Sequence, residues 1–388
     1  MSEATLKRVD LIFGEYSNEK YKVLAETLKR PNEEIINDLL ESGLKGRGGA
    51  GFPTAMKWKF TAEAPGDEKF VVCNADEGEP GTFKDREILS RVPRKVFSGM
   101  AICGKVIGAN KGFIYLRGEY RFLLPDLLKE LETFHQHVKK LDFDFTIEIR
   151  LGSGAYICGE ESALFESMEG GRGEPRNKPP YPTTSGFMKK PTVINNVETF
   201  VNVVMIMRLG PIQFKQLGTK DSRGSKVFSV SGDTPIPGIY ELELGMFLDR
   251  FVEEFGDGDT KAVQVGGASG FCVPRKKFSE TIIGFEGVPT GGSMMLFNSS
   301  RSMYNVLRNY LEFFEEESCG QCTPCRVGCQ QLRKGIEAVK KGTNSAGYLD
   351  QLMKLSESMK ITAKCGLGQS VANSFSSIVT NFKEEMIY

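Results

Sequence analysis

The chain has 388 residues with 50 basic and 50 acidic side chains, a formal net charge of zero, and 40% hydrophobic residues. This balance excludes the basic footprint of a dedicated nucleic-acid-binding protein, and the hydrophobic content excludes an intrinsically disordered chain. The 43 glycines follow no fixed period, no apolar run approaches the roughly 18 residues of a membrane span, and residues 1–10 lack a signal-peptide core. We therefore expect a cytoplasmic, multidomain globular protein without a membrane span.

Helix and strand patterns alternate over the first 225 residues. Residues 1–42 read as helices, and Asn32 is a plausible N-cap for a helix over 33–42. Further elements follow, with strands predicted at 69–73, 112–117 and 145–151 and helices at 94–107 and 126–140. Residues 170–191 are rich in Gly, Pro and Lys and read as a long functional loop. This alternation predicts a mostly parallel sheet wrapped by helices.

The pattern changes near residue 226. Strand, strand, helix and strand are predicted in that order, at 226–231, 239–244, 246–255 and 262–265. This order fits a small β-grasp (ubiquitin-like) module, and helical patterns dominate from residue 302. We therefore expect three domains, namely an α/β domain with the N-terminal helices over 1–225, a β-grasp domain over 226–290 and a helical domain over 291–388.

Cysteine and histidine restrict the chemistry that is available. Nine cysteines, five of them in the last fifth of the chain, do not form the even, dispersed set of a secreted disulfide framework, so a reducing cytoplasm is expected. The two histidines, His135 and His137, fall in a charged helical stretch and read as part of a solvated face. A Ser–His–Asp hydrolase or a His-ligated zinc enzyme is hard to assemble, so chemistry must use cysteine, carboxylates or a bound cofactor.

Three cysteines near the C-terminus have the spacing of an iron–sulfur site. Cys319, Cys322 and Cys325 form C-x₂-C-x₂-C, which lets a short loop bind three corners of an iron–sulfur cube. Zinc sites more often use two separated C-x₂-C pairs, and the second pair is absent. The spacing favours a 4Fe–4S cluster over a zinc site or plain buried thiols.

Two cysteines are candidates for the fourth ligand. Cys329 completes C-x₂-C-x₂-C-x₃-C, but Gln330 stands where the ferredoxin run has proline, and in two-cluster ferredoxins this cysteine binds the other cluster. Cys365 lies in a glycine-flanked turn after a predicted helix, where the backbone can close over a cluster. We favour Cys365 and interpret Cys329 as a core thiol or an outer neighbour of the cluster. The other cysteines are expected to be buried and structural, namely Cys73, Cys103, Cys158 and Cys272.

Two glycine-rich loops offer bare backbone to a ligand. Gly46–Gly51 matches G-x-G-x-x-G, but a helix rather than a strand is predicted before it, so it is no Rossmann fingerprint. Its N–H groups and Lys57 could cradle a phosphate or a flavin, although a plain turn explains the loop as well. The second loop, 152–161, ends in Glu160 and Glu161 at a predicted helix start. These acids would repel a pyrophosphate, so they read as acceptors for ribose hydroxyls or an amide, or as ordinary helix-start acids.

Two polar segments follow or begin predicted elements. Residues 73–81 (CNADEGEPG) place three acids directly after a strand, where open α/β sheets gather ligand groups, although a solvated acidic turn is the alternative. Asn195 and Asn196 could bond a ring system or a phosphate, and as an isolated pair they read first as a helix cap.

Together, five segments carry a specific resemblance, namely 46–60 (GRGGAGFPTAMKWKF), 74–83 (NADEGEPGTF), 155–161 (AYICGEE), 195–199 (NNVET) and 317–326 (ESCGQCTPCR). In this order they resemble the NADH-binding flavoprotein subunit of respiratory complex I, which also occurs in NAD-linked hydrogenases and formate dehydrogenases. The likeness covers residues 40–388. It implies a Rossmann-like domain that binds FMN and NAD(H) in one cavity, then a β-grasp domain and a C-terminal helical bundle with a 4Fe–4S cluster.

The resemblance also implies site residues. It assigns FMN to Gly48, Gly49, Gly51, Lys57, Asn74, Asp76, Tyr156, Gly159, Glu160, Asn195, Asn196 and Thr199. It assigns NAD(H) to Phe52, Phe60, Glu79, Glu161, Lys178 and Tyr181, with the aromatic rings stacked on the adenine. It assigns the cluster to Cys319, Cys322, Cys325 and Cys365. No catalytic side chain is implied, because hydride passes directly between the two cofactors.

The chain departs from the family pattern in a few places. Tyr181 stands where phenylalanine is usual, and Cys329 stands where a small polar residue is common. The C-x₂-C-x₂-C-x₃-C run that Cys329 completes resembles that of the related Rnf-type subunit. We expect no thioredoxin-like or ferredoxin-like extension of the kind that some relatives have. We therefore expect separate partners, a thioredoxin-like 2Fe–2S subunit and a larger iron–sulfur or catalytic subunit, and no nucleic acid. An electron-relay subunit without nucleotide binding, or an adaptor with structural zinc, are the alternative functions.

Overall fold

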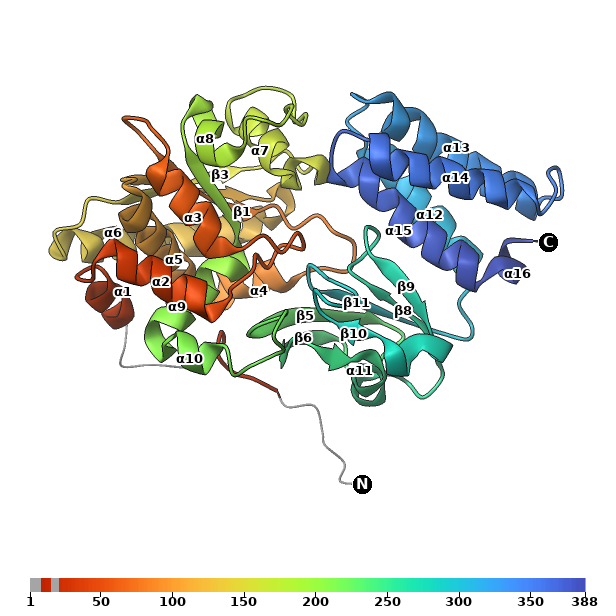
Figure 1. Cartoon of the computed structure of the whole chain (residues 1–388), viewed down its shortest axis with the longest axis horizontal. Helices are drawn as coiled ribbons and strands as arrows, with labels where there is room; N and C mark the ends of the chain where they lie inside the picture. Colours follow the sequence, from red (N-terminus) through yellow and green to blue (C-terminus); the bar gives the residue numbers. More distant parts are fainter. Residues whose placement is uncertain (1–7, 15–20, 388) are drawn as a thin grey trace.

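The computed structural model describes residues 8–14 and 21–387, and the expected helices over 1–7 and 15–20 lie outside these residues. Figure 1 shows three regions: a large lobe built on the first sheet, a smaller sheet below it, and a group of C-terminal helices beside both. No helix in the described ranges combines the length and apolarity that a membrane crossing requires.

The large lobe is built on a four-stranded sheet with the order β3-β2-β1-β4. The strands are β1 (Phe70–Ala75), β2 (Lys111–Leu116), β3 (Thr146–Leu151) and β4 (Thr192–Asn196). All three neighbouring pairs are parallel. The predicted parallel α/β fold is therefore confirmed, and the three strands predicted at 69–73, 112–117 and 145–151 are present with small shifts at their ends.

Both faces of this sheet are covered, as is usual for parallel sheets. Successive side chains of a strand point to opposite faces. Val71 and Cys73 of β1 accordingly pack into one hydrophobic core, and Phe70 and Val72 pack into another. The first core is closed mainly by helices before, between and after the strands, namely α1 (Lys22–Thr27), α2 (Asn32–Ser42), α3 (Thr54–Glu63), α4 (Lys84–Arg91), α5 (Pro93–Ile107), α6 (Leu124–Lys140) and α9 (Val197–Leu209).

Shorter helices complete the lobe. The second core contains residues of α7 (Glu161–Met168) and continues into the C-terminal helices. The short elements are η1 (Gly118–Leu123), η2 (Tyr156–Gly159), α8 (Pro182–Ser185), η3 (Phe187–Lys189) and α10 (Pro211–Phe214). The loop predicted over 170–191 is thus largely irregular, with α8 and η3 inside it.

The smaller sheet has the order β6-β5-β11-β8-β9. Its strands are β5 (Ser225–Gly232), β6 (Gly238–Glu243), β8 (Thr260–Val265), β9 (Phe271–Pro274) and β11 (Ser293–Asn298). Helix α11 (Leu248–Phe255) packs Phe251 and Phe255 into the core of this sheet. Met246–Phe247, expected to begin this helix, instead forms β7 and pairs with β10 (Ile282–Ile283), and η4 (Arg275–Glu280) lies between β9 and β10.

Strand β11 corrects the expected domain boundary. It lies in the middle of the small sheet, parallel to β5 and antiparallel to β8. The boundary expected between residues 290 and 291 therefore separates this strand from its own sheet. Residues 293–298 lie far from β5 in the sequence, so the local pattern does not indicate this long-range pairing.

The C-terminal region is helical, as predicted. Its helices are α12 (Met303–Glu317), α13 (Thr323–Lys340), α14 (Tyr348–Thr362), α15 (Gly366–Asn381) and α16 (Lys383–Met386). Helix α15 also contacts the small sheet, because Ser377 accepts a hydrogen bond from the backbone of Cys272 at 3.0 Å and Asn373 donates one to the carbonyl of Ser269 at 3.0 Å. These contacts hold the cysteine region against the rest of the molecule.

Two local predictions were wrong. Asn32 is the first residue of α2 rather than its cap, and its amide donates to the carbonyl of Lys105. The histidines are not simply solvated: His135 accepts a hydrogen bond from the backbone of Ile147 at 3.0 Å, and His137 stacks on Tyr21 with ring centroids 4.4 Å apart. Both contacts come from elements distant in sequence, which helical periodicity alone does not indicate.

Candidate functional site

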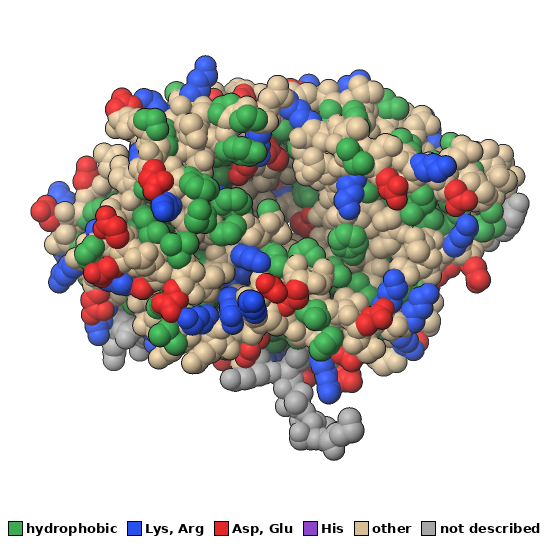
Figure 2. Space-filling model, viewed as in Figure 1, with side chains coloured by type: hydrophobic (Ala, Val, Ile, Leu, Met, Phe, Trp, Pro, Cys, Tyr) green, Lys and Arg blue, Asp and Glu red, His purple; other side chains and the backbone are tan. Residues whose placement is uncertain are grey.

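A cavity of about 300 Å³ lies where the large lobe, the small sheet and the C-terminal helices meet, and Figure 2 shows the molecule hollowed near the middle of the view. We call it the central cavity. The expected site residues in its wall are Gly48, Gly49, Asn74, Asp76, Glu79, Tyr156, Gly159, Glu160 and Asn196. Further wall residues come from the small sheet and α15, namely Gly266, Ser269, Gly291, Gly366 and Leu367. All three regions therefore contribute to one cavity.

The first glycine-rich loop reaches the cavity because its glycines allow close approach to neighbouring backbone. Gly49 and Gly51 have φ angles of 115° and 67°, in the region that favours glycine. A Cβ on Gly51 would lie 2.3 Å from the ring of Phe285, and one on Gly48 would lie 3.2 Å from Cβ of Asn196. The loop thus packs against β4 and the small sheet and leaves bare backbone at the cavity.

Asp76 is an unsatisfied acid in the cavity wall. Neither of its carboxylate oxygens has a hydrogen-bond partner among the described residues, although both are buried. Burial raises the pKa of Asp76 to about 7, with smaller contributions from Arg117, which opposes the rise, and from Glu119 and Glu317. Buried polar groups normally have partners, so this carboxyl is suited to a polar ligand in the cavity. Neighbouring Asn74 is already bonded, because its amide donates to the Gly159 carbonyl at 2.9 Å.

Glu77 has a structural role that differs from both sequence interpretations of the acidic loop. Its carboxylate accepts hydrogen bonds from the backbone of Asp85 at 2.8 Å and Arg86 at 3.2 Å, and from the hydroxyl of Tyr120 at 2.8 Å. Glu77 is buried, and burial raises its pKa to about 7. It therefore holds the start of α4 and is not part of a solvated turn.

Tyr156 and Glu79 connect the three regions at the cavity. The Tyr156 hydroxyl donates to Glu79 at 2.6 Å, and the Ser269 hydroxyl donates to the same carboxylate at 2.5 Å. The Tyr156 backbone N–H donates to Glu317 at 2.8 Å, two residues before the first cysteine of the cluster motif. Burial raises the pKa of Glu79. This junction fixes the cavity wall relative to the cysteine region.

The second glycine-rich loop ends as a capped helix. Glu160 caps α7, accepting hydrogen bonds from the backbone N–H groups of Ser162 and Ala163, both at 2.9 Å. Lys178 pairs with Glu160 at 2.8 Å and with Glu161 at 2.6 Å. The helix-start interpretation therefore holds for Glu160, and its carboxylate also lines the central cavity.

Three residues expected at the cofactor lie just behind the cavity wall. Lys57 donates to the Ile194 carbonyl at 2.8 Å, and burial lowers its pKa. Thr199 accepts a hydrogen bond from the backbone of Arg47 at 2.9 Å. The Asn195 amide oxygen faces the indole N–H of Trp58 at 3.0 Å. In this structure these side chains fasten the first loop, α3 and β4 together. Of the two asparagines Asn195 and Asn196, which were interpreted as a helix cap, Asn196 does cap α9.

Three exposed aromatic rings lie outside the central cavity. Phe52, Phe60 and Tyr181 are 47%, 45% and 59% exposed. Phe52 precedes α3 and Phe60 lies on it, while Tyr181 precedes α8, which contacts α3. Large exposed rings have no packing role of their own, so they are available for stacking on a planar ligand.

Four cysteines line one pocket: Cys319, Cys322, Cys325 and Cys365. Cys322 precedes α13 and Cys365 precedes α15, so two helix N-termini meet at the pocket and favour negative charge there. Cys329 lies one turn further along α13, fully buried, and does not line the pocket. No group of three or more His, Cys, Asp or Glu side chains in the described ranges converges on a single metal ion. A cubane does not need this, because each thiolate binds a different iron.

The cysteine pocket and the central cavity share part of their walls. Ile157 and Leu367 line both. Ile157 lies in η2, beside the cavity residue Tyr156, and Leu367 lies two residues after Cys365. The two sites are therefore neighbours that share these two apolar side chains. The other four cysteines, Cys73, Cys103, Cys158 and Cys272, are buried, as expected.

No sequence motif indicates the buried group of charged side chains beside the cavity. Lys84, Asp85, Glu198 and Lys226 are each at most 2% exposed, and Arg47 is 1% exposed. Glu198 is the single acid in the otherwise apolar first turns of α9, and a lone charge in such a helix is a signal that could have indicated a buried ion pair. Its lysine partners come from two other parts of the chain, near residues 84 and 226.

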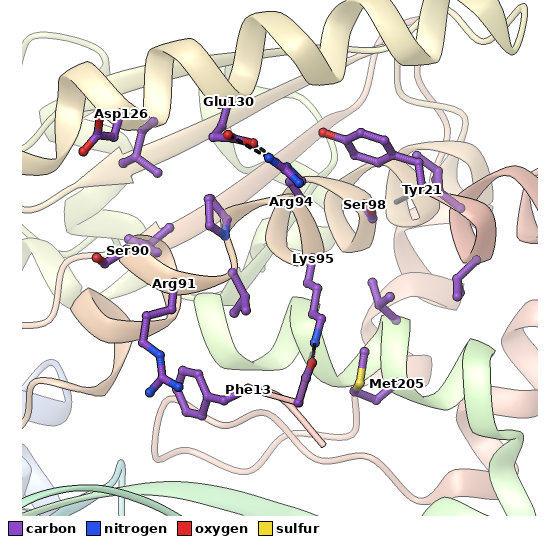
Figure 3. Close-up of a pocket in the computed structure, with 18 of the residues that line it drawn as sticks. Phe13, Tyr21, Ser90, Arg91, Arg94, Lys95, Ser98, Asp126, Glu130 and Met205 are labelled. Carbon is purple, nitrogen blue, oxygen red and sulfur yellow. Dashed lines mark hydrogen bonds and ion pairs between the residues drawn. The ribbon is translucent and has the colours of Figure 1, made fainter. Parts of the chain in front are cut away.

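A larger cavity of about 840 Å³ lies elsewhere, between α1, α5, α6 and α9 (Figure 3). Its wall includes the Arg94–Glu130 ion pair and Lys95, which donates to the carbonyl of Ile12 at 2.7 Å. None of the expected site residues lines it. Residues 15–20, which connect Gly14 and Tyr21 in its wall, lie outside the described part of the chain, so this cavity carries no functional assignment.

Comparisons with known proteins agree with this geometry. Residues 39–205 match the Nuo51 FMN-binding domain, and residues 305–388 match the NADH-ubiquinone oxidoreductase-F iron–sulfur binding region. The chain is 41% identical to the NAD-reducing hydrogenase HoxS subunit alpha of Cupriavidus necator, over 99% of this chain and 65% of that protein. It is 38% identical to the F 2 subunit of NADH-quinone oxidoreductase of Rhizobium meliloti, over 95% of this chain and 91% of that protein.

The fold is also similar to that of a solved hydrogenase structure. The crystal structure of an NAD⁺-reducing [NiFe]-hydrogenase in the air-oxidized state superposes with a TM-score of 0.90 at 40% identity, over all of this chain and 68% of that chain. The chain spans about two thirds of the length of the hydrogenase subunit alpha. With an FMN-binding domain and a 4Fe–4S binding region in one chain, the protein belongs to the family of NADH-quinone oxidoreductase F subunits and their counterparts in NAD-reducing hydrogenases.

Proposed function

We propose that the chain is the NAD(H)-binding subunit of a cytoplasmic multi-subunit oxidoreductase. In this proposal hydride passes between NAD(H) and FMN, and single electrons pass between FMN and a 4Fe–4S cluster. FMN supplies the conversion between two-electron and one-electron chemistry when it is bound. The residues of the chain bind and orient the two nucleotides and separate them from the cluster.

The observation that carries this proposal is the shared wall between the central cavity and the cysteine pocket. Ile157 and Leu367 contact both sites, so a flavin in the cavity and a cluster in the pocket would be close neighbours. A relay subunit without nucleotide binding needs no such cavity beside its cluster. The FMN-binding domain over residues 39–205 also disfavours that alternative.

The FMN assignment rests on the backbone and the acid that face the cavity. Gly48, Gly49 and Gly159 present backbone without side chains, and Asp76 is a buried carboxyl that lacks a partner among the described residues. The remaining FMN residues that we propose are Gly51, Lys57, Asn74, Tyr156, Glu160, Asn195, Asn196 and Thr199. Of these, Lys57, Asn195 and Thr199 are proposed to act by holding the loop and β4 in place, given their present contacts.

The NAD(H) assignment rests on the exposed rings and on charged groups near α7. Phe52, Phe60 and Tyr181 are proposed to stack on the adenine. Lys178 is available to a phosphate if it leaves Glu161, to which it is bonded in this structure. Glu79 and Glu161 are the proposed acceptors for ribose or amide groups.

The cluster ligands that we propose are Cys319, Cys322, Cys325 and Cys365. The pocket brings these four thiols together, and the two helix N-termini beside it stabilise thiolate charge. The Cys329 thiol is proposed to be a buried neighbour. It contacts Cys325, and this hydrogen bond lowers the pKa of Cys325 to about 7.

The domain layout and partners are also proposals. The strand order of the small sheet, with β11 paired between β5 and β8, supports a β-grasp domain over 225–298, followed by a helical cluster domain. An electron that leaves the cluster needs an acceptor outside this chain. We propose a thioredoxin-like 2Fe–2S subunit and a larger iron–sulfur or catalytic subunit of hydrogenase, formate dehydrogenase or complex I type.

Replacing Phe60 by alanine tests the nucleotide site. Stacking of a base on an aromatic ring contributes about 1–3 kcal/mol, so Phe60→Ala is expected to raise the KM for NADH about tenfold in ferricyanide reduction, with unchanged FMN content. Phe247→Ala is the matched control, because Phe247 has the same 45% exposure but lies on β7, which pairs with β10. An equal KM for both variants would contradict the proposed adenine site.

A further inference from the structure

A buried group of charges contacts the central cavity from the side of β4. Lys84 Nζ lies 2.6 Å from Asp85 Oδ1 and 3.1 Å from Glu198 Oε2. It also donates to Asn196 Oδ1 at 3.1 Å, while Asn196 Nδ2 donates to Asp85 Oδ2 at 2.7 Å. We call Lys84, Asp85 and Asn196 the cavity triad, because all three side chains line the cavity.

The triad fixes the orientation of one amide. Asn196 Oδ1 accepts from Lys84 and from the backbone N–H of Glu198 at 3.0 Å, and Nδ2 donates to Asp85. The Asn196 amide therefore cannot rotate by 180° without facing donor to donor and acceptor to acceptor. Lys84 and Asp85 thus act on the cavity partly through Asn196, as positioning residues.

Two lysines share Glu198 but face different sites. Lys226 Nζ lies 3.0 Å from Glu198 Oε2, the same oxygen that Lys84 contacts, and it also donates to the Arg47 carbonyl at 2.8 Å. Lys84 lines the central cavity and Lys226 does not. The pKa of Lys84 is raised, because the attraction of Asp85 and Glu198 outweighs burial, so its ammonium stays charged. The two lysines therefore form a natural pair for comparison.

We propose that the cavity triad sets the reduction potential of the bound flavin, with Lys84 raising it and Asp85 lowering it. The proposal rests on the proposed function. When NADH transfers a hydride, FMN gains two electrons and one proton, and NAD⁺ leaves, so the flavin becomes more negative by one charge. A buried positive charge at the cavity wall stabilises that product more than the oxidised flavin, and a buried negative charge does the opposite.

Other charged groups near the triad do not supply the same effect. Glu77 also lines the cavity, but its carboxylate accepts hydrogen bonds from the backbone of α4 and from Tyr120, and burial raises its pKa to about 7. Glu198 is shared between Lys84 and Lys226 and lies behind the triad, outside the cavity wall. Within the ion-pair group of Lys84, Asp85, Glu198 and Lys226, only Lys84 and Asp85 line the cavity.

The test is the midpoint potential of FMN in the full chain, measured by anaerobic spectroelectrochemical titration of the flavin absorbance. Lys84→Met is expected to lower the potential and Asp85→Asn to raise it. Each change should alter the ratio of reduced to oxidised flavin at a fixed potential about tenfold, which is about 30 mV for a two-electron couple. Lys226→Met removes an equally buried charge from the same carboxylate and is expected to leave the potential unchanged.

Opposite shifts of the midpoint potential distinguish this role from a structural one. If the substitutions merely loosened the cavity wall, they would shift the potential of both variants in the same direction. Shifts of the same sign, no shift in either variant, or a shift in Lys226→Met as large as in Lys84→Met would overturn the proposal. If Lys84→Met does not retain FMN, the midpoint potential of the Asp85→Asn variant decides the test. Only a raised potential in that variant supports the proposed role of the triad. Wild-type protein that binds no FMN would refute the proposed function instead.

Discussion

Replacing Cys365 by serine is expected to remove the 4Fe–4S cluster while FMN remains reducible by NADH. Cys365 lines the pocket with Cys319, Cys322 and Cys325, and it precedes α15 in extended conformation, which directs its side chain out of the helix. Iron and acid-labile sulfide should fall from about four atoms of each per chain to below one. Chemical analysis of anaerobically purified variants gives the measurement.

Cys329→Ser is the matched control for this variant. Cys329 is a cysteine of the same motif run, but it is fully buried one turn into α13 and lies outside the pocket. Placing a hydroxyl there costs stability without removing a ligand, so iron and sulfide content should stay near the wild-type values. The reverse outcome, with the cluster lost in Cys329→Ser and kept in Cys365→Ser, would overturn the ligand assignment.

Replacing Glu198 by glutamine is expected to lower the free energy of unfolding by about 3–5 kcal/mol, because it leaves two buried lysines with less compensation. Glu198 is fully buried and lies within 3.1 Å of both Lys84 and Lys226. Its other oxygen accepts from the backbone of Val227 at 2.9 Å, which joins α9 to the small sheet. Urea unfolding followed by circular dichroism measures the change.

An exposed ion pair provides the comparison. Asp67 pairs with Lys190 at 2.6 Å, but its side chain is 84% exposed. Exposed pairs contribute little because water and salt screen them, so Asp67→Asn should leave the urea midpoint unchanged. Equal midpoints for Glu198→Gln and Asp67→Asn would show that the buried group does not stabilise the junction between the large lobe and the small sheet.

The sequence predicted the parts of the fold that depend on local pattern. The parallel strands are short, continuous apolar runs, as expected for strands buried on both faces, so β1 and β2 could be read directly. Strand β11 could not, because its six residues resemble any short apolar segment and their pairing with β5 depends on contacts far away in the sequence. The histidine helix was misjudged for the same reason, since Ile147 and Tyr21 reach it from other elements.

The candidate site was predictable where residue type limits the chemistry. Cysteine spacing indicates a cluster, and the glycine loop and Asp76, which the motifs singled out, line the central cavity. The roles of Lys57 and Glu160 were harder to read, because motif order does not tell whether a polar side chain faces the ligand or the backbone behind it. The Lys84 and Lys226 pair required the structure, since their shared partner Glu198 belongs to a third segment.

The central claim is that NAD(H), FMN and the cluster exchange electrons within this chain. The most direct measurement is an anaerobic titration of the full chain, reconstituted with FMN, iron and sulfide, with NADH. Flavin absorbance and the electron paramagnetic resonance of the cluster are followed together. NADH is expected to bleach the flavin and to produce a paramagnetic cluster signal that Cys365→Ser lacks. A loaded protein in which NADH changes neither signal would contradict it.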